Sequence, residues 1–446
     1  MNKRRFLPLI AVLTLLAVPQ NGAAQYYKDL FVDSGIHLSD YDDFPVARML
    51  GLSWERFTAG EYPDHLTLRD TVTQRALYEG SPIDENGIWL YPDGAPRFRM
   101  IYVHGGLATR HGNSMGEAGR DHLRAFVRGG GSYIGSCAGA FLVSMGGTDF
   151  DKKKGRCRDD QLNFVNDKYL HLFPGRTLET RLSNSYADLI LEKNCPLLKY
   201  SSFGGSRRIP QVRHSNGCCI VEKAPHFPKG TKPLLRFDFP GDTASGRPYP
   251  LTGKIAIWSF RDNDTSGLVI ATGSHPESNP QGMIAKGPSL NLFSALVQYA
   301  LDETGPARIK GSLRNGEPRV MDRRTSDNDP AHARIGDKQY HHFTVQIPQG
   351  ARNIVVRLEG GYPQDDLYLT FRKGGFAWAR EADYADCDLG CDKTLRFDSL
   401  PEGTWYVGVH CATTVDAIPT DKGCIYTGHL ETLNGVPYTL TVFWEK

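Results

Sequence analysis

The stretch "GSYIGSCAGAFLVSMG", residues 131–146, decides the fold of this chain. Its apolar beginning is typical of a short strand, and the small residues from Ala138 onward favour the start of a helix. Cys137 therefore lies at a strand-to-helix turn, with Gly135 and Gly139 on either side. A cysteine at such a turn is either structural or reactive, and the rest of the sequence has to separate the two.

Short apolar strands alternate with helical runs from about residue 26 to residue 303. The segments "KDLFVDSG", "FRMIYVHGG" and "SGLVIATGSH" predict strands that end in glycine-rich turns, whereas "GRDHLRAFVRGG" and "SLNLFSALVQYALDE" predict helices. This alternation predicts an α/β domain with a mostly parallel sheet and helices on both faces. Ligands of such sheets bind beyond the carboxyl ends of the strands, where these turns should meet.

The pattern changes after Glu303. Residues 305–337 are polar and charged, which predicts a linker that merges into an irregular first strand. From Tyr340 onward, short strands separated by glycine and proline turns predict an all-β sandwich. We therefore expect a signal peptide at 1–24, an α/β domain at 25–304, the linker and first strand at 305–337 and a β-sandwich at 338–446.

The first 24 residues have the pattern of a bacterial secretory signal peptide. Lys3, Arg4 and Arg5 precede a short apolar stretch, and small residues precede Gln25. The apolar stretch is shorter than the roughly 20 residues that span a bilayer. The sequence thus predicts a secreted or periplasmic protein without stable membrane insertion after cleavage. The net charge of +2 gives no indication of a nucleic-acid partner, and the oligomeric state is not encoded in any pattern.

Nine cysteines in an exported chain predict disulfide bonds. Cys137 stands apart and is expected to be a free thiol. The other eight form two groups of four, for which we expect four bridges of undetermined pairing; the groups are Cys157, Cys195, Cys218 and Cys219, and Cys387, Cys391, Cys411 and Cys424. A zinc site built from "CDLGC" and the later pair is the alternative for the second group.

The glycines around Cys137 fit a nucleophile elbow, in which a strained turn lifts the reactive side chain toward the substrate. A thiol nucleophile needs a base and an acid that orients the base, and "GSHPE" offers His275 and Glu277 after a predicted strand. Acyl transfer also needs backbone N–H groups for the oxyanion, and the N–H groups of Gly106 and Ala138 are the candidates.

The segments "IYVHGG", "DHLRAFVRGGGSYIGSCAGAF" and "GSHPE" together resemble class I glutamine amidotransferase-like domains, most closely the subgroup named for the N-terminal region of biotin-protein ligase. The resemblance covers about residues 28–302. It implies a flavodoxin-like fold with Cys137 as nucleophile, His275 as base and Glu277 as the orienting acid. The family usually has proline where this chain has His104, so His104 and Gly105 are either further pocket groups or a neutral strand end.

The segments "YHHFTVQIPQGARNIVVRLEGG", "DDLYLTF" and "GTWYVGV" resemble a bacterial pre-peptidase C-terminal domain. Such domains are appended to secreted hydrolases, so this resemblance implies extracellular hydrolysis. Asp365 and Asp366 are then candidates for a calcium site, and an acidic turn entering a strand is the alternative. No other cofactor is expected.

Taken together, these features predict a secreted cysteine-dependent hydrolase of the amidase or peptidase type, which acts through an acyl-enzyme on a peptide or an amide-containing small molecule. Since nothing in the sequence resembles a biotin ligase catalytic domain or an ammonia-accepting synthetase domain, biotin ligation and glutamine-fed synthesis are not expected. One alternative is a non-catalytic extracellular binding protein with a degenerate amidotransferase-like pocket and an adhesive sandwich. Another is a thiol metal site of Cys137, His275 and His104.

Overall fold

The computed structural model describes residues 25–33, 44–57, 77–151, 156–239, 251–278, 286–420 and 423–446. The predicted signal peptide at 1–24 lies outside these ranges, so export stays a prediction from the sequence. Within the described ranges, no helix combines the length and the apolar character that crossing a lipid bilayer requires.

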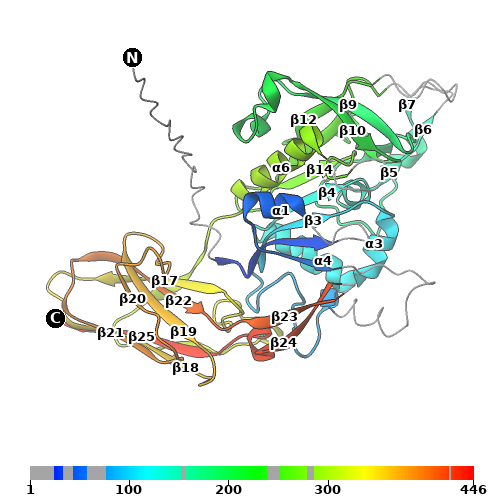
Figure 1. The fold of residues 1–446 in the computed structure, drawn as a ribbon. Helices are drawn as coiled ribbons and strands as arrows, with labels where there is room; N and C mark the ends of the chain where they lie inside the picture. The colour runs from blue at the N-terminus through cyan, green and yellow to red at the C-terminus, as the bar shows by residue number, and fades with distance from the viewer. Residues whose placement is uncertain are drawn as a thin grey trace, which may run out of the picture.

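A nine-stranded sheet forms the centre of the first part of the chain (Figure 1). Its order is β10–β9–β12–β13–β14–β4–β3–β1–β2. The pairs from β14 to β2 are parallel, and those from β10 to β14 are antiparallel. The strands are β1 (Lys28–Asp33), β2 (Trp54–Phe57), β3 (Phe98–Val103), β4 (Ser132–Ser136), β9 (Ser185–Leu191), β10 (Arg208–His214), β12 (Lys232–Phe237), β13 (Ile255–Phe260) and β14 (Val269–Thr272).

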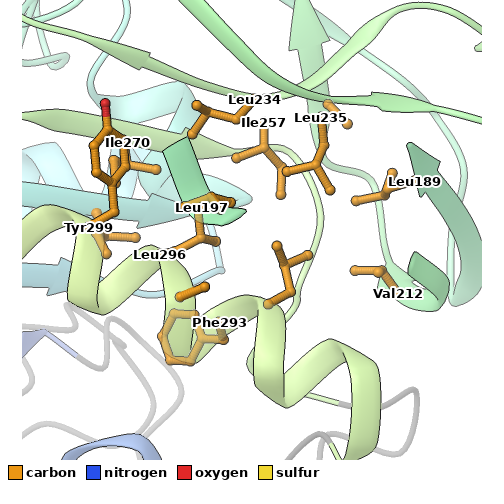
Figure 2. Packing of buried hydrophobic residues seen from close by; sticks show 14 of the residues in the cluster. Leu189, Leu197, Val212, Leu234, Leu235, Ile257, Ile270, Phe293, Leu296 and Tyr299 are labelled. Carbon is orange, nitrogen blue, oxygen red and sulfur yellow. The ribbon is translucent and has the colours of Figure 1, made fainter. Parts of the chain in front are cut away.

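Helices cover both faces of this sheet, which confirms the predicted fold class. They are α1 (Pro45–Leu50), α3 (Ala108–Ser114), α4 (Gly116–Arg128), α5 (Ala138–Leu142) and α6 (Gly287–Asp302). Helices α1 and α6 share one apolar core with the sheet, and Figure 2 shows Phe293 and Leu296 of α6 in it, among leucines and isoleucines of the strands. Helices α3, α4 and α5 share the other core. Strand β3 serves both, because successive side chains of a strand point to opposite faces.

The loop-rich segment between β4 and β13 supplies the antiparallel half of the sheet and two smaller sheets. The sequence pattern indicated loops there because these strands are short or interrupted by polar residues. The smaller sheets contain β5 (Gly147–Thr148), β8 (Thr177–Glu179) and β11 (Cys218–Ile220), and β6 (Phe150–Asp151) and β7 (Arg156–Cys157); the 3₁₀ turns are η2 (Asp159–Gln161), η3 (Pro196–Lys199) and η4 (Phe203–Gly205).

The second part of the chain is an all-β sandwich, as the sequence predicts. A five-stranded sheet, β15–β17–β22–β19–β20, and a four-stranded sheet, β16–β25–β18–β21, enclose one apolar core. Two of these strands, β15 and β16, lie in the polar segment expected to be a linker. The strands are β15 (Ile309–Leu313), β16 (Arg319–Met321), β17 (Tyr340–Ile347), β18 (Arg352–Gly360), β19 (Leu367–Lys373), β20 (Tyr384–Asp386), β21 (Lys393–Ser399), β22 (Gly403–Cys411) and β25 (Tyr438–Glu445), with the 3₁₀ turns η5 (Thr325–Asp327) and η6 (Leu430–Leu433).

The hairpin of β23 (Val415–Thr420) and β24 (Gly423–Gly428) connects the two parts (Figure 1). The Tyr426 hydroxyl donates a hydrogen bond of 2.5 Å to Glu55 at the edge of the nine-stranded sheet. Nearby, the buried guanidinium of Arg97 donates to Asp337 at 2.8 Å. Because breaking a buried ion pair leaves an uncompensated charge, these contacts hold the two parts together.

The eight cysteines with described side chains are free thiols, so the predicted bridges among them are absent, and Cys424 lies outside the described side chains. Cys218 and Cys219 show the reason. They are neighbours on β11 and point into opposite cores. Cys195, Cys391 and Cys411 are likewise buried in apolar cores, where cysteine acts as a small hydrophobic residue. Sequence spacing carries no information about this burial.

The turn at Cys137 requires a glycine on each side. A Cβ at Gly139 would lie 2.4 Å from the carbonyl oxygen of Val103, and one at Gly135 would lie 2.5 Å from the backbone of Gly139. Strand β4, helix α5 and strand β3 therefore approach each other more closely than any side chain allows.

We expect Gly139→Ala to destabilise the protein by roughly 1–3 kcal/mol, because backbone has to move to admit the methyl group. Gly375→Ala is the matched control, since the nearest atoms to its added Cβ lie 3.9 Å away. Urea unfolding of both variants measures the difference. Equal stability of the two variants would contradict the packing described for the turn.

Candidate active site

Three neighbouring strands bring the predicted site residues to one edge of the nine-stranded sheet. His104, Gly105 and Gly106 follow β3, Cys137 follows β4, and His275 with Glu277 follows β14. Because β3, β4 and β14 are adjacent and parallel, their carboxyl ends meet. The residues predicted from three distant motifs therefore form one cluster.

Cys137 occupies a strained position between strand and helix. Its φ of 49° and ψ of −100° lie in a region that residues other than glycine rarely adopt. Its N–H donates to the carbonyl oxygen of Thr272 at 2.9 Å, which ties the turn to β14. The side chain is buried, and its thiol donates to the carbonyl oxygen of Ser215 at 3.5 Å. This geometry is that of the predicted nucleophile elbow.

His275 and Glu277 are bonded to each other. His275 Nδ1 lies 2.8 Å from Glu277 Oε1, and both side chains are buried. On its other side, the imidazole is hydrogen-bonded to Cys137. A Cβ added to Gly105 would meet the His275 ring at 2.6 Å and Cys137 at 3.5 Å, so only glycine fits beside the pair.

Glu277 is held by more groups than the sequence indicated. Ser136 Oγ donates to Oε2 at 2.9 Å, and the Tyr102 hydroxyl donates to Ser136 at 3.2 Å. His104 Nε2 lies 3.4 Å from Oε1, so His104 faces the cluster and contacts its carboxylate. Of the two interpretations of His104, the structure thus favours a further polar group of the site.

The charges of the cluster follow from burial and these contacts. Burial lowers the pKa of His275, but attraction to Cys137 and Glu277 outweighs it and raises the pKa to about 10. Burial raises the pKa of Glu277, but attraction to His275 lowers it to about 2. Burial lowers the pKa of His104 to about 3. At neutral pH the cluster therefore contains an imidazolium beside the Cys137 sulfur, a carboxylate and a neutral imidazole.

The two predicted oxyanion donors differ in exposure. Gly106 has a φ of 136° and lines the cavity in front of Cys137. Ala138 is the first residue of α5, where a backbone N–H has no acceptor within its own helix, but its side chain is buried behind the turn.

The cavity has a volume of about 710 Å³. Its lining includes His104, Gly105, Gly106, Cys137 and His275 of the site. It also includes groups between β4 and β13, which are Phe141, Asp149, Gln161, Phe164, Asn166, Tyr169, Glu179, Arg213, Ser215 and Asn216. Arg181 contacts both acidic groups, Asp149 and Glu179, whereas the guanidinium of Arg213 donates to the Ser278 hydroxyl at 2.9 Å. This volume falls within the roughly 300–1,000 Å³ of small-molecule sites.

Sequence reasoning missed several of these groups. Ser215 and Arg213 come from β10 and the turn after it, and the Arg213 carbonyl accepts the His275 N–H at 2.8 Å. No local motif could have placed them, because the pairing joins segments far apart in the chain. Ser136 carried a signal, since it directly precedes the predicted nucleophile.

Two metal hypotheses can be compared with the structure. In the described part of the chain, His104, His275 and Glu277 offer ligand atoms within 4.8 Å of one another, and Cys137, which the thiol metal hypothesis included, is not part of that group. Asp365 and Asp366, the calcium candidates, contact different groups and do not face a common site. Asp366 Oδ1 accepts the Gly390 N–H at 2.6 Å, whereas Asp365 is fully buried in another cluster.

Comparisons with known proteins connect the site to one family. Residues 75–311 match the family model described as "Biotin-protein ligase, N terminal". A biotin-protein ligase of Schizosaccharomyces pombe is 24% identical over 250 residues, which are 54% of this chain and 35% of that protein. The chain thus spans about a third of the length of this curated relative.

Solved structures with low similarity include a glutamine amidotransferase, at 18% identity and a TM-score of 0.27 over 46% of this chain and 78% of that one. A protein from Thermoplasma acidophilum, described as a GMP synthase component, has 10% identity and a TM-score of 0.35 over 62% of this chain and 95% of that one.

The family match overturns the predicted secreted cysteine hydrolase, and with it the alternative of an adhesive binding protein. The matched family and the curated relative are named for biotin–protein ligation, which the sequence reasoning had set aside. The error has a chemical reason. A thiol, an imidazole and a carboxylate can pass an acyl group to water or to an amine, so the triad alone does not identify the acceptor.

We expect Cys137→Ser to lower the pKa of His275 by about 1–3 units, because it removes the side chain whose attraction most strongly favours the imidazolium. Titration of the histidine ring protons by NMR measures the shift. Cys219→Ser is the control, since Cys219 is buried in another core. An unchanged His275 titration in Cys137→Ser would contradict the contact.

Proposed function

Because the chain belongs to the biotin-protein ligase N-terminal family, we propose that it takes part in biotin–protein ligation as a thiol enzyme that carries the acyl group. In this proposal Cys137 accepts a biotinyl group as a thioester and passes it to an amine of an acceptor protein. The observation that carries the proposal is the strained, buried thiol of Cys137 beside a protonated His275 at the cavity wall.

The proposed reaction has two steps. In the first, the Cys137 sulfur attacks an activated carboxyl carbon, such as that of an acyl-phosphate anhydride; a C–S bond forms and the C–O bond to the phosphate breaks. In the second, the amine attacks the thioester; a C–N bond forms and the electron pair of the C–S bond returns to sulfur. In the first step His275 passes the thiol proton to the solvent, and in the second it takes a proton from the attacking amine and returns it to the sulfur. Glu277 orients the His275 ring, and the N–H groups of Gly106 and Ala138 hold the oxyanion.

The proposed steps begin after the carboxyl group has been activated. The chain corresponds to about a third of its curated ligase relative, so the remaining two thirds of that relative have no counterpart in the match. The proposal therefore concerns the handling of an acyl group that is already activated.

The cavity supports an acyl group of the biotin type. Biotin combines an apolar ring and chain with a ureido group that both donates and accepts hydrogen bonds. The cavity offers aromatic surface from Phe141, Phe164 and Tyr169, and amide groups from Gln161 and Asn166. Apolar walls with a few polar groups are typical of small-molecule sites.

We also propose that the β-sandwich is a pre-peptidase-type C-terminal domain, because several of its sequence segments resemble one. The proposed domain boundaries lie near residues 304 and 337. In this proposal the sandwich has no catalytic role. It supplies no residue to the cavity wall described above.

The decisive experiment treats the purified full chain with biotinyl-adenylate and measures its intact mass. We expect one biotinyl group on the wild type, removable by hydroxylamine, and none on Cys137→Ala. Cys219→Ala should behave as the wild type, because burial raises the pKa of the Cys219 thiol to about 12 and keeps it unreactive. His275→Ala should slow labelling roughly 10²-fold or more.

A second stage adds an acceptor peptide with a lysine. We expect a biotinyl-lysine amide to form on the peptide and the free Cys137 thiol to be regenerated. Release of free biotin alone, or labelling of Cys137→Ala at the wild-type rate, would refute ligation through this thiol.

A further inference from the structure

A second cluster of ionisable side chains lies in the β-sandwich, outside the site described above. Asp365 is in the turn between β18 and β19, and His429 and Glu431 flank the start of η6 after β24. His429 Nδ1 lies 3.2 Å from Asp365 Oδ1 and 3.0 Å from Glu431 Oε1. All three ligand atoms lie within 4.8 Å of one another.

Asp365 is the unusual member of this cluster. It is fully buried, and neither of its carboxylate oxygens accepts a hydrogen bond of ordinary geometry from the described part of the chain. A buried carboxylate is costly unless donors or a cation compensate it.

We propose that Asp365, His429 and Glu431 bind a divalent transition-metal ion, with zinc as the ion that fits best. Zinc accepts both imidazole nitrogen and carboxylate oxygen as ligands, and three protein ligands with a water molecule make a four-coordinate site. Zinc bonds of about 2.0–2.1 Å in a tetrahedron place ligand atoms roughly 3.3–3.4 Å apart, close to the two distances around His429.

The exposure of the cluster fits the same ion. The His429 and Glu431 side chains are 43% and 31% exposed, so solvent can reach the cluster and a water molecule can complete four-coordination. Calcium fits less well, because it takes six to eight oxygen ligands and one of the three groups here is a nitrogen. Asp366, the other calcium candidate, is bonded to Gly390 instead.

The position of the cluster gives the ion a structural role. Asn434, at the end of η6, accepts the Glu85 N–H at 2.8 Å and donates to the Pro82 carbonyl at 2.7 Å. Both partners belong to the part of the chain that contains the nine-stranded sheet. An ion that fixes η6 to the β18–β19 turn therefore also stabilises this contact between the two parts.

The test uses the full chain after treatment with a chelator. Zinc is titrated in competition with a chromophoric chelator, and the thermal midpoint is measured with and without zinc. We expect one zinc site in the wild type and a midpoint that rises with zinc, because an ion that binds only the folded state stabilises it. His429→Ala and Asp365→Asn should bind zinc at least about tenfold more weakly and lose the rise.

Two control variants separate this site from other zinc-binding groups. His332→Ala removes an imidazole that lies 2.8 Å from Asp329 in the same sandwich, in a pair and not in a cluster of three. Cys137→Ser removes the thiol of the other cluster. Both should keep the sandwich site and the rise of the midpoint.

The half-exposed His429 makes His429→Ala the decisive variant, because its substitution leaves the core intact even where Asp365→Asn impairs folding. Wild-type zinc affinity in His429→Ala would overturn the proposal. So would a wild type that binds no zinc at micromolar concentrations, since the cluster would then be an ion pair of protonated His429 with two carboxylates.

Discussion

The close approach of β3, β4 and β14 at their carboxyl ends is the constraint on which the site depends. Cys137 has a left-handed φ of 49°, a conformation that costs roughly 1–3 kcal/mol and persists only when its surroundings impose it. They do so from two sides. The Cys137 N–H is bonded to Thr272 of β14, and α5 lies against the Val103 carbonyl at Gly139. The packing that places the sulfur at the cavity therefore also holds β3, β4 and β14 together at their carboxyl ends.

The second constraint is the charge of Glu277. A buried carboxylate is stable only with partners, and Glu277 has His275, His104 and Ser136 around it. Attraction to His275 keeps Glu277 ionised, and Cys137 together with the ionised carboxylate keeps His275 protonated. His104 stands where the related domains usually have proline, whose side chain carries no charge and makes no hydrogen bond. It therefore adds polar support to a triad that is otherwise of the ordinary kind.

The sequence predicted those features that depend on local patterns. Glycines around Cys137, the strand before His275 and the pair at Gly106 are each encoded within a few residues, and parallel topology then brings them together. Long-range pairing was not predictable. Arg213 contacts His275 because β10, which is far from His275 in the sequence, belongs to the same sheet. The prediction of four disulfide bonds was wrong for the described cysteines, because the spacing of cysteines in the sequence does not show which of them are buried in separate cores. The sandwich was recognised from its turns, but β15 and β16 were hidden by polar composition.

The prediction of hydrolysis failed for a different reason, because the triad on which it rested does not identify the acceptor and the appended domain gave only indirect support. The sandwich contacts the rest of the chain through Arg97 and Glu55, and neither residue lines the cavity. A domain that supplies no group to the cavity cannot decide whether water or an amine receives an acyl group. That choice depends on which nucleophile reaches the carbon bonded to Cys137 while His275 holds the proton. The decisive groups are therefore those of the loop-rich segment that lines the cavity, and their identity follows from tertiary structure alone.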